Sequence, residues 1–435
     1  MNRRAGHGVY PHRSVAGIRE GTNPVEQNKV VAYSWVVFSV VVAAQGVALG
    51  LSVTCIPPFF TTIAAELQLT ATQVGTAWGM IGFGAMLFSI VGGLISDRIG
   101  VRWTGFLGLV LMALGGALRG YADTYLQFLA VMLLFGIGLG IAGPNFSRAL
   151  SQWFPPERRG MANGVSVAAG AFGGALAMAI SVSTIGPLVG GWRNIVIIFG
   201  GLTFVLAIAW IILVKERILG ERLAPGVSAV MKGFALVLRS KPIWVLSLVS
   251  LLLMGHAQAW SSHMPGFFEN RHGMTNAAAG QFVSIALFSG IIAAILGPTL
   301  SDRSGLRKPA MLIACVIGAL CNLIQGSFLG PVLFAVLILL PYGFGIIGPL
   351  LFTVPFELKE LHHTIAGAAI GMILTMQNIG AFAYPIISGK LIDLFAPNYY
   401  PFFVAQMMTF AVSFFLVWWL LPETGPRMAK AAETA

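Results

Sequence analysis

The sequence predicts an all-α membrane protein of twelve transmembrane helices in two pseudo-symmetric six-helix bundles. Three observations carry this prediction. The chain is 57% hydrophobic and only 9% charged, a composition that excludes a soluble domain. Apolar runs of about 20 residues, each long enough to span a bilayer core, recur between residues 31 and 421. A charged segment between two such runs returns about 205 residues later, as expected for two similar halves.

The apolar runs favour helices over a closed barrel, because barrel strands alternate polar and apolar residues and stretches such as 196–214 do not. In the first half we predict helices over 32–54, 73–96, 103–121, 125–147, 160–184 and 193–214. In the second half we predict them over 242–263, 276–299, 309–328, 331–353, 364–388 and 400–421.

These helices divide the chain into five segments. We expect an N-terminal tail, a first six-helix bundle, a central loop, a second six-helix bundle and a C-terminal tail over 1–30, 31–214, 215–241, 242–421 and 422–435. The central loop is the longest internal polar segment, which makes it the linker between the bundles.

The basic residues are distributed unequally between the two sides of the predicted helices. One side holds 22 of the 26 Lys and Arg residues. By the positive-inside rule this side faces the cytoplasm. We therefore expect a multi-pass protein of the cell (inner) membrane with both termini in the cytoplasm. Because the charge is dispersed over many short loops, the net charge of +11 does not indicate a nucleic-acid partner. The three cysteines have no ligand spacing, and no ATP-binding loop or catalytic triad is present, so we expect no enzyme activity, metal or cofactor.

The charged segment has the form Ser-Asp-Arg-x-Gly-x-Arg. Its first copy contains Asp97, Arg98, Gly100 and Arg102, with Gly93 shortly before it. Its second copy contains Asp302, Arg303, Gly305 and Arg307. The glycines permit a tight chain reversal between two helices.

Glycines repeat at a second offset. Gly160, Gly164 and Gly173 match Gly367, Gly371 and Gly380 at an offset of 207 residues, with a spacing of four residues from the first to the second glycine of each set. Small residues at this spacing let helices approach closely in lipid, so we expect these faces to pack tightly against a neighbour, in a contact that is static or that slides during transport.

These features resemble the major facilitator superfamily over residues 31–425. The charged segment matches that family's loop signature, although Val101 replaces one basic residue. The segment 153–160 resembles a loop of organic-anion porters of the oxalate/formate and anion:cation symporter types. The resemblance implies a monomeric transporter with a small-molecule substrate, in which the two halves rock about a central site.

All 15 acidic residues lie in predicted tails, loops or helix ends, which argues against a buried carboxylate relay and leaves a coupled or exchanged ion open. His256, with Gln258 nearby, either loads a proton or anion or is a neutral, hydrogen-bonded histidine. Arg119 either binds a carboxylate or extends its charge to the membrane interface. Its repeat counterpart is Gln325.

Polar side chains near the predicted midplane are candidate substrate ligands. They are Gln45, Tyr342, Gln377 and Asn378, on helices that line the cavity in the family. The alternative is hydrogen bonding between helices. Gln377 replaces Gly170 of the first half, and packing alone does not require an amide there.

A cytoplasmic gate is expected beside the charged segments. We predict ion pairs between Arg148 and Asp97 and between Glu357 and Arg303, made when the inner side is closed and lost when it opens.

The sequence therefore predicts a secondary transporter, active or facilitative, for a small organic anion such as a mono- or dicarboxylate. An exporter of amphipathic compounds and a non-transporting receptor or assembly factor on the same fold are the alternatives.

Overall fold

The computed structural model describes residues 24–217, 235–326, 331–358 and 363–428. These residues form helices and no strand. Ten stretches are long and apolar enough to cross a membrane, and the longest, Ala71–Tyr121, holds two helices that meet at Gly100. Counting that stretch twice and adding α13 (Pro331–Glu357) gives the twelve predicted passes within the described chain. The protein is therefore an all-α membrane protein, as predicted.

The first pass is a broken helix. It begins as α1 (Pro24–Ala44), becomes the π-helical η1 (Gln45–Leu51), and continues through α2 (Ser52–Thr54), η2 (Pro57–Phe59) and α3 (Phe60–Leu67). Pro57 and Pro58 have no backbone N–H, so the carbonyl groups one turn earlier lose their helical partners. Such a break at membrane depth requires hydrogen-bond donors from neighbouring helices.

Five more passes complete the first half. They are built from α4 (Ala71–Leu118) with η3 (Arg119–Tyr121), α5 (Tyr125–Trp153), α6 (Pro156–Ile180) with η4 (Ser181–Ile185) and α7 (Gly186–Val189), and α8 (Trp192–Leu213). Gly100 interrupts α4 with φ 85°, a backbone conformation that favours glycine. The chain reversal that the charged segment predicts is confirmed there.

The second half, from residue 235 onward, supplies the other six passes. They are α10 (Lys241–His272), α11 (Asn276–Ser304), α12 (Lys308–Gln325), α13, α14 (His363–Phe395) and α15 (Tyr400–Leu420). Gly305 ends α11 with φ 70°. Helix α10 extends nine residues past the predicted end at residue 263, because it stops only where Gly273 adopts φ 64°. The apolar run alone did not indicate this polar extension.

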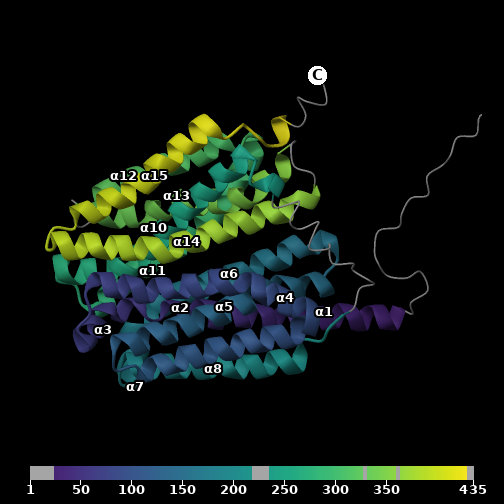
Figure 1. The fold of residues 1–435 in the computed structure, drawn as a ribbon, viewed down its shortest axis with the longest axis horizontal. Coiled ribbons are helices and arrows are strands. Elements are labelled where there is room, and N and C mark those ends of the chain that lie inside the picture. Colours follow the sequence, from purple (N-terminus) through teal and green to yellow (C-terminus); the bar gives the residue numbers. More distant parts are fainter. Residues whose placement is uncertain (1–23, 218–234, 327–330, 359–362, 429–435) are drawn as a thin grey trace, which may run out of the picture.

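The two halves occupy separate sides of the molecule (Figure 1). Helices α4 and α6 of the first half contact α14 and α11 of the second. Large buried side chains fill each half, including Phe146 and Trp210 in the first and Phe402 and Phe410 in the second. Aliphatic and aromatic side chains on the outer helix faces remain exposed, as expected for a lipid-facing surface. The line of contact between the halves is here called the seam.

Candidate functional site

The seam is hydrogen-bonded at one end only. In the described residues, every hydrogen bond between the halves lies toward the end away from the charged turns at Gly100 and Gly305, here called the far end. At its edge, the carboxylate of Asp393 accepts bonds from the backbone N–H groups of Ala71 and Thr72, both at 2.8 Å. The Thr72 hydroxyl donates a third at 2.5 Å. An acidic side chain of α14 thus caps the N-terminus of α4, where the helix dipole favours negative charge.

A second group of hydrogen bonds joins α3 to α10 and α11 at the same end. The Thr61 hydroxyl donates to Oε2 of Glu269 at 2.6 Å. The Asn276 amide donates to the hydroxyl oxygens of Thr61 and Thr62 at 3.4 and 3.2 Å. These contacts and those of Asp393 close the far end on both sides of the seam.

Backbones touch along the deeper part of the seam. A Cβ atom on Gly79 would lie 2.5 Å from the Phe382 carbonyl oxygen, and one on Gly75 would collide with the Pro385 carbonyl oxygen. Beside them, the indole N–H of Trp78 donates to Oε1 of Gln258 at 3.1 Å. Glycine is required at these positions because α4 and α14 are too close for any side chain.

Among the described residues, two aromatic pairs mark the depth at which contacts across the seam stop. Phe83 packs against Phe382 with ring centroids 4.9 Å apart, and Phe172 packs against Phe288 at 5.7 Å. Phe83 and Phe288 are equivalent positions of the two halves, at the offset of 205 residues. Phe83 lies twelve residues after Ala71, so the closed part of α4 is about 18 Å long at 1.5 Å per residue.

Beyond these pairs the halves are apart. A Cβ atom built on Gly143, Gly160, Gly164, Gly348 or Gly371 would meet nothing within 4 Å. The expected tight packing of Gly160, Gly164 and Gly371 is therefore wrong for this conformation. These glycines lie on the part of α6 and α14 that the separation of the halves leaves without a neighbour. The surroundings of Gly367 lie outside the described part of the structure.

The remaining repeated glycines do pack closely, as predicted. Gly173 meets the Gly46 carbonyl oxygen, and Gly380 meets the Leu251 carbonyl oxygen, too closely for a Cβ atom. The first pass therefore packs on α6 as α10 packs on α14, with equivalent glycines at both junctions.

Three of the predicted polar ligands, Gln45, Gln377 and Asn378, lie at or near these junctions. Gln45 is 9% exposed, and its Oε1 lies 3.5 Å from the Cβ position of Gly170. Gln377, which stands at the equivalent place in α14, is partly buried. Asn378 donates to the Leu374 carbonyl oxygen of its own helix at 3.0 Å. Tyr342 lies in α13, but its side chain is outside the part of the structure that is described.

His256 is placed away from the seam. It is buried, its Nδ1 lies 2.8 Å from Oε1 of Gln406 on α15, and its ring packs edge-on against Phe410. This geometry corresponds to the hydrogen-bonded alternative for His256. Gln258, two residues later, faces the seam through its bond from Trp78.

Arg119 does not extend to the membrane interface, so that alternative is wrong. Its side chain is fully buried in the first half, where Nη1 donates to the Ser52 carbonyl oxygen at 2.9 Å and the guanidinium lies 4.0 Å from the Phe135 ring centroid. Ser52 in turn bonds Thr203 at 2.9 Å. Arg119 thus supplies a donor at the break in the first pass. Its counterpart Gln325 accepts a bond from Trp260 of α10 at 3.2 Å.

The charged turns form ion pairs within each half. Arg148 Nη1 lies 2.7 Å from Oδ1 of Asp97 and also donates to the Gly93 carbonyl oxygen at 3.3 Å, which confirms the predicted pair. Arg102 donates to the Ile211 carbonyl oxygen at 2.7 Å and thereby ties α4 to α8.

The predicted pairing of Glu357 with Arg303 is wrong. Glu357 accepts from Arg307, with Nη2 at 2.7 Å and Nε at 3.0 Å, and Asp302 pairs with the same guanidinium at 2.5 Å. The Glu357 carboxylate holds the pKa of Arg307 above its usual value. Gly305 brings Arg307 back toward α11, which the order of the motif residues does not reveal.

The expected state dependence of these pairs is also not what the structure shows. The Asp97–Arg148 and Glu357–Arg307 pairs each join residues of one half, and both are made while that end of the seam is open. Residues of one half keep their distances when the halves separate as rigid bodies, so such pairs need not break.

Sequence reasoning missed Asp393, Glu269 and the aromatic pairs. Asp393 and Thr72 are 321 positions apart, and nothing in the chain marks them as partners. The only local signal was the Thr70 to Gln73 capping box at the start of α4, which indicates a helix start but not what lies beyond it.

Known proteins resemble this chain over most of its length. The model of the Major Facilitator Superfamily matches residues 42–369. The probable sulfoacetate transporter SauU of Cupriavidus necator is 23% identical over 79% of this chain and 84% of its own. The probable galactarate/D-glucarate transporter GarP of Escherichia coli is 24% identical over 77% of this chain and 82% of its own.

A solved structure shares the fold. The crystal structure of a bacterial homolog to the human lysosomal transporter Spinster superposes with a TM-score of 0.71 at 16% identity, covering 91% of this chain and 97% of that one. The family model covers three quarters of the sequence and the helices pack as two related halves. The chain belongs to the Major Facilitator Superfamily and is a membrane transporter rather than an enzyme.

Proposed function

We propose that the protein carries a small organic anion, a carboxylate or sulfonate, across a cell (inner) membrane by alternating access. The observation that carries the mechanism is the one-sided seam: hydrogen bonds between the halves are confined to the far end among the described residues. An alternating-access carrier needs two conformations, each open at one end of the seam only. The conformation described here is open at the end that carries the charged turns. The relatives named for sulfoacetate and for galactarate support the anion class.

The open end faces the cytoplasm in this proposal. The charged turns, the central loop and both termini together carry most of the Lys and Arg residues, and positive charge is retained on the cytoplasmic side. Each half supplies its own face of the path, so the protein works as a monomer. A co-transported or exchanged ion completes the cycle if transport is active.

Amide side chains, rather than Arg119 or His256, contact the substrate. Both of those side chains are buried inside one half. Gln45 and Gln377 lie at equivalent junctions of the two halves, next to the open part of the seam. A hydrogen bond from an amide N–H to a carboxylate or sulfonate oxygen contributes about 1.5 to 3 kcal/mol to binding. Replacing the glutamine with an apolar side chain of similar size removes that contribution.

Uptake into proteoliposomes tests this proposal. Labelled sulfoacetate, D-glucuronate and galactarate are compared for the wild type, Gln377→Leu and Gln45→Leu. We expect saturable uptake of at least one anion and a KM raised about tenfold or more in each variant, as loss of one hydrogen bond to an anion requires. His256→Gln is the matched control, because it changes a buried polar side chain away from the seam, and its KM should stay near that of the wild type.

Two results would contradict the proposal. Uptake of lipophilic cations with none of the anions would identify an exporter of amphipathic compounds. An unchanged KM in both amide variants, with a raised KM in His256→Gln, would move the site to the interior of the second half.

A further inference from the structure

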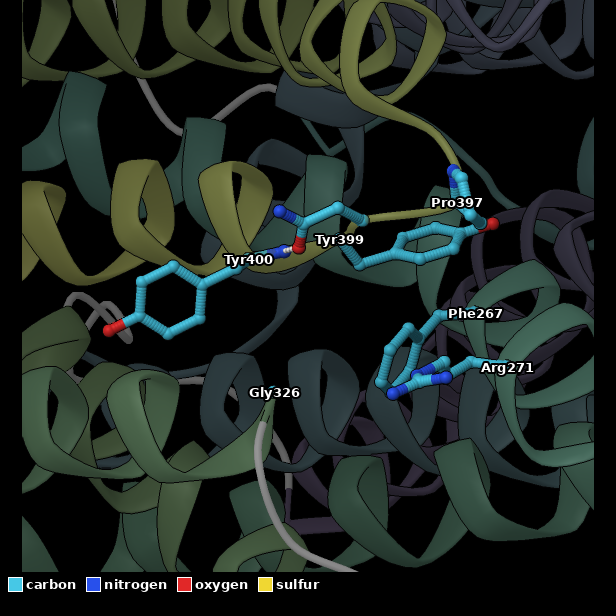
Figure 2. Close-up of a pocket in the computed structure, with 7 residues that line it drawn as sticks. Phe267, Arg271, Gly326, Pro397, Tyr399 and Tyr400 are labelled. Atoms are coloured by element: carbon cyan, nitrogen blue, oxygen red, sulfur yellow. Dashed lines mark hydrogen bonds between the residues drawn. The ribbon is translucent and has the colours of Figure 1, made fainter.

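A cavity of about 510 Å³ lies at the far end of the second half. The end of α10 contributes Phe267 and Arg271, the connection from α14 to α15 contributes Asn398 and Tyr399, and the start of α15 contributes Tyr400 (Figure 2). Its volume is that of a site for a small organic molecule. None of its lining residues belongs to the amide junctions at the open part of the seam.

One wall of the cavity is aromatic and firmly held. Phe267 is fully buried and packs edge-on against Tyr399 with ring centroids 5.2 Å apart. The Asn270 amide donates to the Tyr399 hydroxyl oxygen at 3.3 Å. Fixed rings of this kind accept the apolar or planar body of a ligand without losing side-chain entropy on binding.

The polar groups of the cavity are donors for an anion. Arg271 is exposed and forms no ion pair with any described carboxylate. Oδ1 of Asn398 accepts the Tyr400 backbone N–H at 3.0 Å, which leaves the Asn398 amide nitrogen free to donate. A planar guanidinium without a carboxylate partner suits a carboxylate or sulfonate group.

The cavity adjoins the closed part of the seam. On α10, Glu269 bonds to Thr61 across the seam, while Phe267 and Arg271, one turn apart, line the cavity. On α14, Asp393 caps α4 only a few residues before Asn398. An anion held here lies beside the contacts that must separate before a substrate can enter from this end.

We infer that this cavity is an extracytoplasmic binding site for a small organic anion with an apolar or planar body, separate from the transport site. The inference rests on the proposed orientation and substrate class. It assigns Arg271 the carboxylate or sulfonate, and it assigns the body of the ligand to Tyr399, which the buried Phe267 holds in place.

A fluorescence titration at the cavity tests the inference without measuring transport. Ala396→Cys places an exposed thiol at the rim, and the native Cys55, Cys315 and Cys321 are buried, so a bimane label reports this position. The labelled protein in neutral-lipid nanodiscs is titrated with benzoate and with sulfoacetate. We expect a saturable response to benzoate, none to the uncharged benzamide, and a half-saturation concentration raised about tenfold by Arg271→Gln, as loss of a charge-assisted bond predicts.

Matched variants separate the outcomes. Lys390→Gln removes a positive charge from the same exposed end but not from the cavity, so it should leave the titration unchanged, and Arg271→Lys should recover part of the affinity. No saturable response, or equal half-saturation in the wild type and Arg271→Gln, overturns the inference. An Arg271-dependent response to phosphatidylglycerol but not to benzoate also overturns it, because the occupant is then a lipid headgroup. Binding here without uptake of any organic anion would instead count against the proposed function.

Discussion

Asp393 on α14 caps the first turn of α4 by accepting the backbone N–H groups of Ala71 and Thr72 at 2.8 Å. One side chain thereby joins the two halves at the closed end. A capping interaction of this type contributes about 0.5 to 2 kcal/mol. Because two helix termini are held by a single carboxylate, the balance between the two conformations should depend strongly on that residue.

Asp393→Ala should shift the population toward the state that is open at the far end, by about 2- to 30-fold for a loss of 0.5 to 2 kcal/mol. Distances between spin labels on α3 and on the end of α10 would measure this shift. Asp393→Asn keeps one acceptor oxygen and should give a smaller effect. Identical distance distributions in the wild type and Asp393→Ala would remove the capping residue from the gate.

Gly164→Leu and Gly371→Leu should fold in the present conformation, since a Cβ atom at either position meets nothing within 4 Å. The added side chains should prevent the open end from closing, and transport should fall at least tenfold while thermal stability stays close to that of the wild type. Gly173→Leu is the contrasting variant, because its Cβ would collide with the Gly46 backbone and the protein should be destabilised. Normal transport by Gly164→Leu would show that α6 does not approach a neighbour there during the cycle.

Arg119→Gln should leave the KM for the transported anion within about twofold of the wild type, because the guanidinium lies inside the first half and not on the seam. The variant should lower the thermal unfolding temperature, since among the described residues the Ser52 carbonyl would keep only the weak Cys55 thiol as a donor and a hydrogen bond from a charged group contributes about 1.5 to 3 kcal/mol. Parallel transport and thermal-unfolding measurements check both effects. A large rise in KM with unchanged stability would return Arg119 to the list of substrate ligands.

Arg307→Ala should destabilise the second half more than Arg303→Ala does. The Arg307 side chain is only 6% exposed, while its partners Glu357 and Asp302 are 21% and 60% exposed, so its loss should cost more than the roughly 1 kcal/mol of an exposed pair. Thermal unfolding of the two purified variants provides the comparison. Equal unfolding temperatures would mean that Arg303 can replace its neighbour as the partner of Glu357.

Asp97→Asn should reduce initial uptake while leaving expression largely intact. The Asp97 and Arg148 side chains are 49% and 40% exposed, so their pair contributes no more than about 1 kcal/mol to folding. Uptake is measured in proteoliposomes with matched protein content. Unchanged initial uptake would remove Asp97 from the gating residues, although its pair with Arg148 is present.

The fold could be predicted from the sequence because its signals are local or repeated. Apolar length identifies each pass, and Gly100 and Gly305 stand where the backbone needs a positive φ. The Asp97–Arg148 pair was also predictable, because both residues lie at the same end of adjacent helices in one half.

The contacts across the seam could not be predicted in the same way. These contacts depend on the orientation of the two rigid halves relative to each other. In a different relative orientation the same residues have no neighbour. Gly164 and Gly173 illustrate the difference: both belong to the repeated pattern, but only Gly173 has a neighbour in this conformation. The partner of Glu357 was mistaken for a simpler reason, since three basic residues follow one another closely and only the backbone path after Gly305 selects Arg307.

The makeup of the seam has a consequence for the speed of the transport cycle. All the ion pairs in the described residues lie within one half or the other, and the halves meet through hydrogen bonds, glycine contacts, two aromatic pairs and apolar packing such as that of Met178 against the second half. Each of these contacts is individually weak in net free energy. Thermal energy can therefore separate them in steps, and turnover should quicken smoothly on warming, without the abrupt onset that a seam locked by buried ion pairs would impose.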